Sequence, residues 1–129
     1  MTPDAELLRD LQDPEAYPPP RPAAVEVRET HLSWVFLTDR DAWKIKKPVN
    51  FGFVDYTTPE KRLAFCREEV RLNRRLAPDV YLGVRAVAAT SDGLELADER
   101  DSRAVDYLVE MRRYDDAGTL PSATTSRSW

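Results

Sequence analysis

Apolar and polar positions alternate, or apolar positions run together, in several short segments, and this pattern predicts a β-sheet. The segments are residues 25–28, 34–37, 42–49, 81–90, 94–96 and 104–111. A polar turn at residues 38–41 joins the second segment to the third, and a tight turn at residues 91–93 precedes the shortest one. We therefore expect an antiparallel sheet of about five strands.

One long helix is predicted between the third and fourth strands. Thr58 is a suitable N-cap, Pro59 suits the first helical position and Pro78 ends the helix, which we expect to run to about Ala77. At about 100° per residue, one broad arc of this helix is apolar. It holds Leu63, Cys66, Val70, Leu72, Leu76 and Ala77. This arc is expected to pack on the sheet, which gives an α+β fold.

The two ends of the chain do not follow the strand pattern. Leucines at positions 7, 8 and 11 predict a short helix, and the prolines at 18–20 and 22 predict an extended connector. Near the other end the sequence is small, polar and aperiodic, as in a disordered tail or a chain that stops before its next element. We expect a preface at residues 1–22, a folded domain at 23–114 and a tail at 115–129.

A carboxylate lies within the apolar arc of the predicted helix. Glu69 falls near its centre with Asn73, whereas Glu68 lies beside the solvated side. Burying an unpaired carboxylate costs several kcal/mol, so Glu69 requires a cationic partner from the sheet. Lys44 and Lys46 are two residues apart on the third strand, share one face and are the obvious donors.

A strand lysine paired with a helix glutamate is how kinase-type folds hold the phosphates of ATP. Lys44 is preferred to Lys46 because Ala42, two residues before it on the same face, leaves room for an adenine ring. A salt bridge that merely ties the helix to the sheet explains the same pattern. Arg62, on the same helix as Glu69, is another possible partner for that carboxylate.

The connection between the first two strands covers the phosphates in kinase-like lobes. Here Thr30, His31 and Ser33 could donate hydrogen bonds to a phosphate, although no glycine lies in this connection. A polar turn with one exposed histidine is the alternative interpretation.

Composition narrows the classes of function. The 129 residues suffice for one domain, and the net charge of −4 argues against general nucleic-acid binding. The only cysteine, Cys66, excludes a disulfide framework, and its position favours a core role over nucleophilic catalysis with His31. No apolar run approaches the roughly 18 residues of a membrane span, so we expect a cytoplasmic protein without a membrane partner.

Several motifs, in order, resemble those of a bacterial family related to aminoglycoside phosphotransferases. They are ETHLSWVFLT at 29–38, AWKIKKPV at 42–49, FGFVDY at 51–56, Glu69 with LNRRL at 72–76, and YLGV at 81–84. The resemblance covers roughly residues 7–120 and implies the N-terminal lobe of a protein-kinase-like fold. It implies that Lys44 holds ATP phosphates, that Glu69 pairs with Lys44, and that Met111 or its neighbours touch the base. Many family members carry a second, P-loop ATPase-like domain.

The catalytic half of such an enzyme is absent from this sequence. Kinase-like catalysis needs an aspartate base and a second aspartate for magnesium on later loops. The resemblance implies that residues 108–112 lead into the hinge between the two lobes. The only histidine, His31, and the asparagines at 50 and 73 all precede these residues. We expect an ATP-binding lobe without catalytic or metal-binding residues of its own, truncated or frame-shifted. Its expected partners are a nucleotide and a missing C-terminal lobe or P-loop ATPase-like domain.

Two rival functions remain open. One is a stand-alone regulatory module that pairs with another chain. The other is a small RNA-binding α+β domain that uses the arginine-rich helix.

Overall fold

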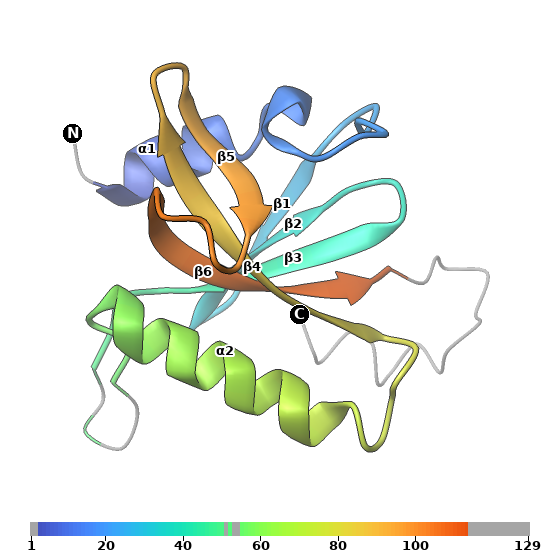
Figure 1. Ribbon diagram of the computed structural model, residues 1–129, viewed down its shortest axis with the longest axis vertical. Helices are drawn as coiled ribbons and strands as arrows, with labels where there is room; N and C mark the ends of the chain where they lie inside the picture. Colours follow the sequence, from blue (N-terminus) through green and yellow to red (C-terminus); the bar gives the residue numbers. More distant parts are fainter. Residues whose placement is uncertain (1–2, 51, 53–54, 114–129) are drawn as a thin grey trace.

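One curved antiparallel sheet, with a helix on either side of it, makes up the fold. The computed structural model describes residues 3–50, 52 and 55–113. The sheet has the strand order β1-β2-β3-β6-β4-β5, so β6 lies between β3 and β4 (Figure 1). The strands are β1 (Glu26–Glu29), β2 (Ser33–Leu37), β3 (Asp41–Lys46), β4 (Tyr81–Thr90), β5 (Gly93–Asp98) and β6 (Ala104–Arg112). The helices are α1 (Pro3–Asp10), α2 (Pro59–Asn73) and a single 3₁₀ turn at Pro14–Ala16.

The α+β class and the antiparallel sheet with one main helix are confirmed, with six strands where about five were expected. Strand β4 has its predicted bounds, and β2 and β3 pair as the predicted hairpin. Strand β3 ends at Lys46, earlier than predicted, shortly before Pro48, which has no N–H to donate to a ladder. The predicted tail at residues 115–129 lies outside the described residues.

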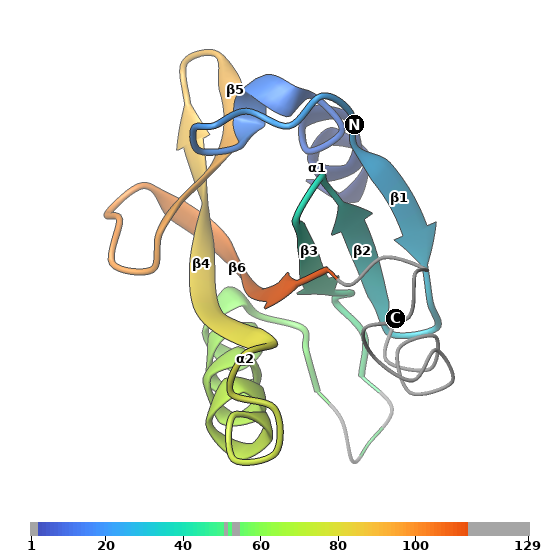
Figure 2. The ribbon, with the colours of Figure 1, turned by 90° about the vertical axis from the view of Figure 1, so that its right-hand side faces the viewer.

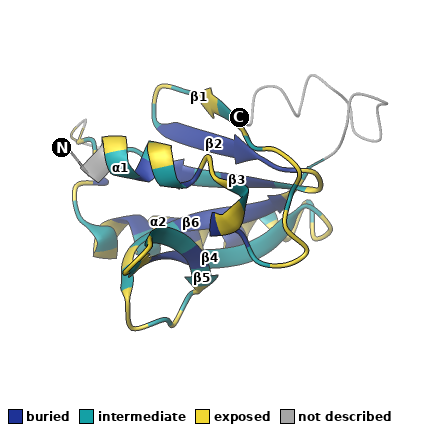
Figure 3. Ribbon diagram, turned by 90° about the horizontal axis from the view of Figure 1, so that it is seen from above, coloured by how far each residue is buried: buried dark blue, intermediate teal, exposed yellow. Residues whose placement is uncertain are grey.

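Alternation along β3 divides the core into two clusters. Trp43 and Ile45 belong to the cluster on the α1 side, and Ala42 belongs to the cluster on the α2 side. Successive side chains of a strand point to opposite faces, which places Lys44 and Lys46 on the α2 side with Ala42. Figure 3 shows β2 and much of β3 in the colour of buried residues. Strand β3 therefore lies between two layers.

The N-terminal segment is part of the core. Leu7, Leu11 and Tyr17 are buried with Trp43, and the Tyr17 hydroxyl donates a hydrogen bond of 2.6 Å to the Leu11 carbonyl. The rings of Tyr17 and Trp43 meet edge to face at 5.5 Å. Figure 2 shows α1 on the inner side of the curled sheet and α2 on the outside near β4 and β6. The structure thus packs residues predicted as a preface against the sheet.

A close approach at Gly93 holds α1 to the β4–β5 hairpin. Gly93 has a φ of +121°, and a Cβ atom there would lie 2.9 Å from Asp10 Oδ2. That same carboxylate oxygen accepts a hydrogen bond of 3.0 Å from the Leu94 backbone N–H. A glycine is needed here for both its backbone conformation and its lack of a side chain.

Helix α2 begins as predicted and ends earlier. The Thr58 side chain accepts a hydrogen bond from the Lys61 backbone N–H, as expected of an N-cap. The helix ends at Asn73, and a turn carries the chain to Ala77, because the residue before a proline avoids the helical conformation.

The apolar arc of α2 is narrower than predicted. Arg62, Cys66 and Val70 form its buried stripe, whereas Leu72 and Leu76 are 47% and 86% exposed. Leu72 lies about 120° around the axis from Cys66, too far to reach the sheet. The prediction that these two leucines pack on the sheet is therefore wrong.

Candidate functional site

Two strand lysines share one helix glutamate between β3 and α2. Lys44 Nζ lies 2.5 Å from Glu69 Oε2, and Lys46 Nζ lies 2.8 Å from Glu69 Oε1. The side chains are 13%, 8% and 15% exposed for Lys44, Lys46 and Glu69, so the cluster is mostly shielded from water. Alternation on β3 predicted the shared face, and the helical wheel predicted the choice of Glu69. We call these three residues the lysine cluster.

Glu68, which the helical wheel placed beside the solvated side of the helix, lies in solvated surroundings as predicted. Its side chain is exposed and pairs with Arg71 one turn along the helix. Glu69, by contrast, lies about 60° around the axis from Cys66, on the flank of the buried stripe and not at its centre. This flank position lets the carboxylate reach both lysines.

Electrostatics keep the lysine cluster ionised. Burial by itself disfavours the charged form of Glu69, but Lys44 and Lys46 outweigh it and hold the pKa of this carboxyl below its ordinary value of 4.5. Burial likewise opposes the charge on Lys46, and the Glu69 carboxylate outweighs it, so the pKa of Lys46 is raised. Glu69 and Lys46 are therefore charged at neutral pH. With two lysines and one glutamate, the cluster has a formal net charge of +1.

A second buried ion pair adjoins the lysine cluster, and sequence reasoning missed it. Arg62 Nε lies 2.8 Å from Asp106 Oδ1, and one terminal nitrogen of Arg62 donates a hydrogen bond of 2.6 Å to the Tyr56 carbonyl. The sequence suggested Arg62 only as another possible partner for Glu69, and in the structure it pairs with Asp106 instead. The sequence did hold one signal for its burial: Arg62 lies four residues before Cys66, so both side chains lie on the same side of the helix.

The neighbours of the lysine cluster follow from strand register. Ser33 lies opposite Lys46, Val35 opposite Lys44, and Met111 opposite Ala42. Ala42 and Met111 are both buried in the apolar cluster under α2. The positions expected to touch an adenine ring are therefore covered in this structure.

The β1–β2 connection is a turn closed by its own polar groups. The Thr30 hydroxyl donates to the Ser33 carbonyl and accepts from the Ser33 N–H. His31 is exposed at this turn. Ser33 is buried next to Lys46, so of the expected donors in this connection it lies closest in register to the lysine cluster.

Cys66 is a core residue. It is fully buried, and burial raises the pKa of its thiol to about 12, far from the thiolate form that a nucleophile needs.

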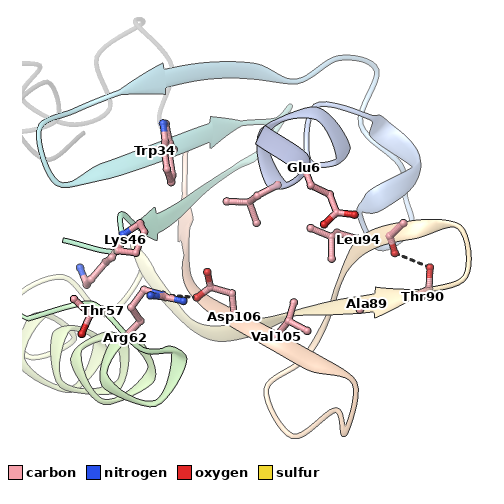
Figure 4. Close-up of a pocket in the computed structure, with 13 residues that line it drawn as sticks. Glu6, Trp34, Lys46, Thr57, Arg62, Ala89, Thr90, Leu94, Val105 and Asp106 are labelled. Carbon is pink, nitrogen blue, oxygen red and sulfur yellow. Dashed lines mark hydrogen bonds and ion pairs between the residues drawn. The ribbon is translucent and has the colours of Figure 1, made fainter. Parts of the chain in front are cut away.

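A cavity of about 490 Å³ opens beside the lysine cluster. Figure 4 shows Lys46 and Arg62 at one end, Glu6 and Thr90 toward the other, and Trp34 and Val105 along the walls. Lys46 thus belongs both to the ion pair with Glu69 and to the wall of this cavity.

The described residues contain no helix long and apolar enough to cross a membrane. Within the same residues, no three His, Cys, Asp or Glu side chains come together as a possible metal site.

Comparison with known proteins gives relatives without assigned functions. The chain is 37% identical over 112 residues to an uncharacterized protein of Mycobacterium tuberculosis (strain ATCC 25618 / H37Rv), and equally to one of Mycobacterium bovis. The match covers 87% of this chain and 20% of each relative, so the chain spans about a fifth of their length. No family model and no solved structure matches.

Proposed function

We propose that this chain is the nucleotide-binding lobe of a kinase-like phosphotransferase, in which the lysine cluster binds the phosphates of ATP. The observation that carries the proposal is the pairing of Lys44 and Lys46 with Glu69 across the gap between β3 and α2. Kinase-type folds use a lysine of the third strand, held by a helix glutamate, for this purpose.

The surplus charge of the cluster supports phosphate binding in particular. A salt bridge that only ties a helix to a sheet needs one cation and one anion, and a second buried lysine adds desolvation cost without a second counterion. A phosphate oxygen at the cluster would supply that counterion and use N–H donors that Glu69 leaves free.

The adenine part of the proposal needs a rearrangement. Ala42 and Met111 line the expected base position, and both are covered by apolar neighbours. Base binding therefore requires their cover to move, and we expect the phosphates to contribute most of the affinity.

Phosphoryl transfer is assigned to residues outside this lobe. The proposal gives no catalytic role to His31 or to any other residue here, and it places the aspartates for base and magnesium on a second lobe. A C-terminal lobe or a P-loop ATPase-like domain is the partner that the proposal implies.

The RNA-binding alternative is less well supported, because the arginines of α2 have other partners. Arg62 is buried against Asp106, Arg67 pairs with Glu99, and Arg71 pairs with Glu68. The stand-alone module is favoured by the exposed Leu72 and Leu76, which another chain could cover.

Calorimetric titration with adenylyl imidodiphosphate, a non-hydrolysable ATP analogue, tests the proposal. Replacing Lys44 with Met should weaken binding about tenfold or more, the effect of losing one charge-assisted hydrogen bond. Lys47→Met is the matched control, since Lys47 pairs with the exposed Glu29 and not with Glu69. Unchanged affinity in both Lys44→Met and Glu69→Ala would rule out the assignment.

A further inference from the structure

A cavity that shares Lys46 with the lysine cluster, but otherwise lies apart from it, carries a second inference. It lies at the end of β3, between α1, the β4–β5 hairpin and the start of α2, and has a volume of about 490 Å³. Cavities of about 300–1,000 Å³ bind small organic molecules. Lys44, the first phosphate ligand of the proposed function, does not line it.

One end of the cavity is built from cations that are almost entirely buried. The side chains of Lys46 and Arg62 are 8% and 9% exposed, and both line the space (Figure 4). Arg62 pairs with Asp106, which also lines the cavity, whereas Glu69, the partner of Lys46, does not line it. The lining residues at this end are thus two cations and one anion, with a net charge of +1. Desolvated cations in surplus favour an anion at this end.

Unused hydrogen-bond donors point to the same conclusion. Arg62 uses Nε for Asp106 and one terminal nitrogen for the Tyr56 carbonyl. Neither of these two hydrogen bonds uses its other terminal nitrogen, Nη2. A guanidinium offers five N–H donors, so an oxygen ligand can still bind here. Lys46 has likewise donated one hydrogen bond, to Glu69.

The remaining walls define the rest of the ligand. Leu7, Trp34, Leu94 and Val105 provide apolar surface, and Trp34 provides an aromatic ring. Glu6 lies near the far end of the cavity in Figure 4 and would repel a second negative group there. The ligand should therefore carry its negative charge at one end only.

We propose that this cavity binds a small monoanion with an apolar body, such as an aromatic carboxylate, with its anionic group on Lys46 and Arg62. Such a ligand would compete with Glu69 for the Lys46 ammonium group. Occupancy of the cavity would thereby weaken the Lys46–Glu69 contact and couple the cavity to the lysine cluster. The monoanion would bind whether or not the lysine cluster binds ATP in this protein.

Fluorescence titration with anilinonaphthalene sulfonate, an aromatic monoanion, tests the proposal on the whole chain. We expect saturable binding at one site, weakened about tenfold or more in Arg62→Met and in Lys46→Met. The uncharged relative N-phenylnaphthylamine should bind more weakly than the sulfonate and respond little to either substitution. Lys44→Met should bind the sulfonate as the wild type does, because Lys44 does not line the cavity, although it binds the ATP analogue more weakly.

A second variant keeps the test valid if the charge substitutions unfold the chain. Ala89 lines the cavity and is solvent-exposed, so Ala89→Trp should preserve the fold, place a ring in the cavity and abolish sulfonate binding. Sulfonate binding that survives Ala89→Trp, or that is equal in wild type and Arg62→Met, would overturn the proposal. Loss of ATP-analogue binding in Lys44→Met with intact sulfonate binding would separate this site from the proposed function.

Discussion

Side chains of like charge lie close together at both ends of β3, and the pKa values of the two groups respond differently. At the end of β3, Lys44 and Lys46 share the single carboxylate of Glu69, and the pKa shifts of Glu69 and Lys46 both favour the charged form. At its start, Asp41 lies close to Glu110 on the other face of the sheet. Burial and Glu110 raise the pKa of Asp41 to about 7, against the opposing effects of Arg112 and Arg85.

The two ends of β3 differ in whether the repulsion between like charges can be relieved by a change in protonation. The acidic end can take up a proton and so relieve the repulsion between the carboxyl groups of Asp41 and Glu110. The lysine cluster has no such outlet, because the Glu69 carboxylate raises the pKa of Lys46 and two lysines share that one carboxylate. An excess charge that the fold retains is available to a ligand, and this is why we place anion binding at the end of β3 and not at its start.

The largest effect is expected from removing the shared carboxylate. Glu69→Gln leaves two poorly hydrated lysines without a counterion, and breaking a buried ion pair in this way costs about 3–5 kcal/mol in the free energy of unfolding. Urea denaturation at neutral pH measures this loss. Glu68→Gln is the control and should change stability little, since the Glu68 side chain is exposed and pairs with the exposed Arg71. Equal losses in the two variants would show that the shared carboxylate has no special role.

Arg62→Met tests the neighbouring buried pair and should have the next largest effect. It leaves Asp106 and the Tyr56 carbonyl without their guanidinium partner, at a cost of about 3 kcal/mol. The same urea experiment measures it, with Arg67→Met on the exposed side of α2 as the control. A result for Arg62→Met as small as that for Arg67→Met would contradict the burial of this pair.

The raised pKa of Asp41, at the start of β3, predicts how the stability of the fold should change with pH. The pKa of Asp41 is about 7 in the folded chain and 3.8 ordinarily, so the folded chain binds the extra proton between these values. Stability should therefore fall as the pH rises from about 4 to 7, with the cost complete above 7. Asp41→Asn should remove this slope and melt at a higher temperature than wild type at pH 8, but not at pH 4. If the melting temperatures of the two proteins change with pH in parallel between pH 4 and pH 8, the raised pKa of Asp41 is refuted.

The lysine cluster should show the opposite dependence on the acid side. The pKa of Glu69 is depressed, so its contribution is present above its ordinary value of 4.5 and is lost as the pH falls through the lower folded value. Glu69→Gln should therefore flatten the acid limb of the stability curve. A limb of unchanged steepness in this variant would assign acid unfolding to other carboxylates.

The smallest effect is expected at Lys47, which lies next to the cluster but outside it. Lys47 pairs with the largely exposed Glu29 and lies over the Trp34 ring at 5.3 Å. An ion pair of this kind contributes about 1 kcal/mol or less, and Lys47→Met should lower stability by no more than that. A loss of stability as large as that of Glu69→Gln would contradict the claim that the shared lysines of the cluster differ from Lys47, which has a carboxylate partner of its own.

Local patterns were enough to predict that Lys44, Lys46 and Glu69 face one another, although not that both lysines share the carboxylate. Alternation fixes which lysines of β3 share a face, and the helical wheel separates Glu69 from Glu68. The N-cap at Thr58 and the bounds of β4 follow from equally local signals. These features depend on residues within one element, which the sequence displays directly.

Features that depend on pairing between distant segments could not be predicted. The proximity of Asp41 to Glu110 depends on the register of β3 against β6, and the burial of Arg62 depends on Asp106, 44 residues away. The packing of Leu11 and Tyr17 on the sheet is likewise a long-range contact. The exposure of Leu72 shows a related limit, since a wheel gives the apolar arc but not how much of it the sheet covers.

Selective carbon-13 labelling of lysine tests the central claim, that the surplus charge at the end of β3 binds phosphate. The lysines of this chain are Lys44, Lys46, Lys47 and Lys61, and each gives its own ε-methylene signal by NMR. During titration with adenylyl imidodiphosphate, the Lys44 and Lys46 signals should shift together and saturate, while those of Lys47 and Lys61 stay in place. Four signals that remain unmoved, or that drift in parallel without saturation, would contradict the claim.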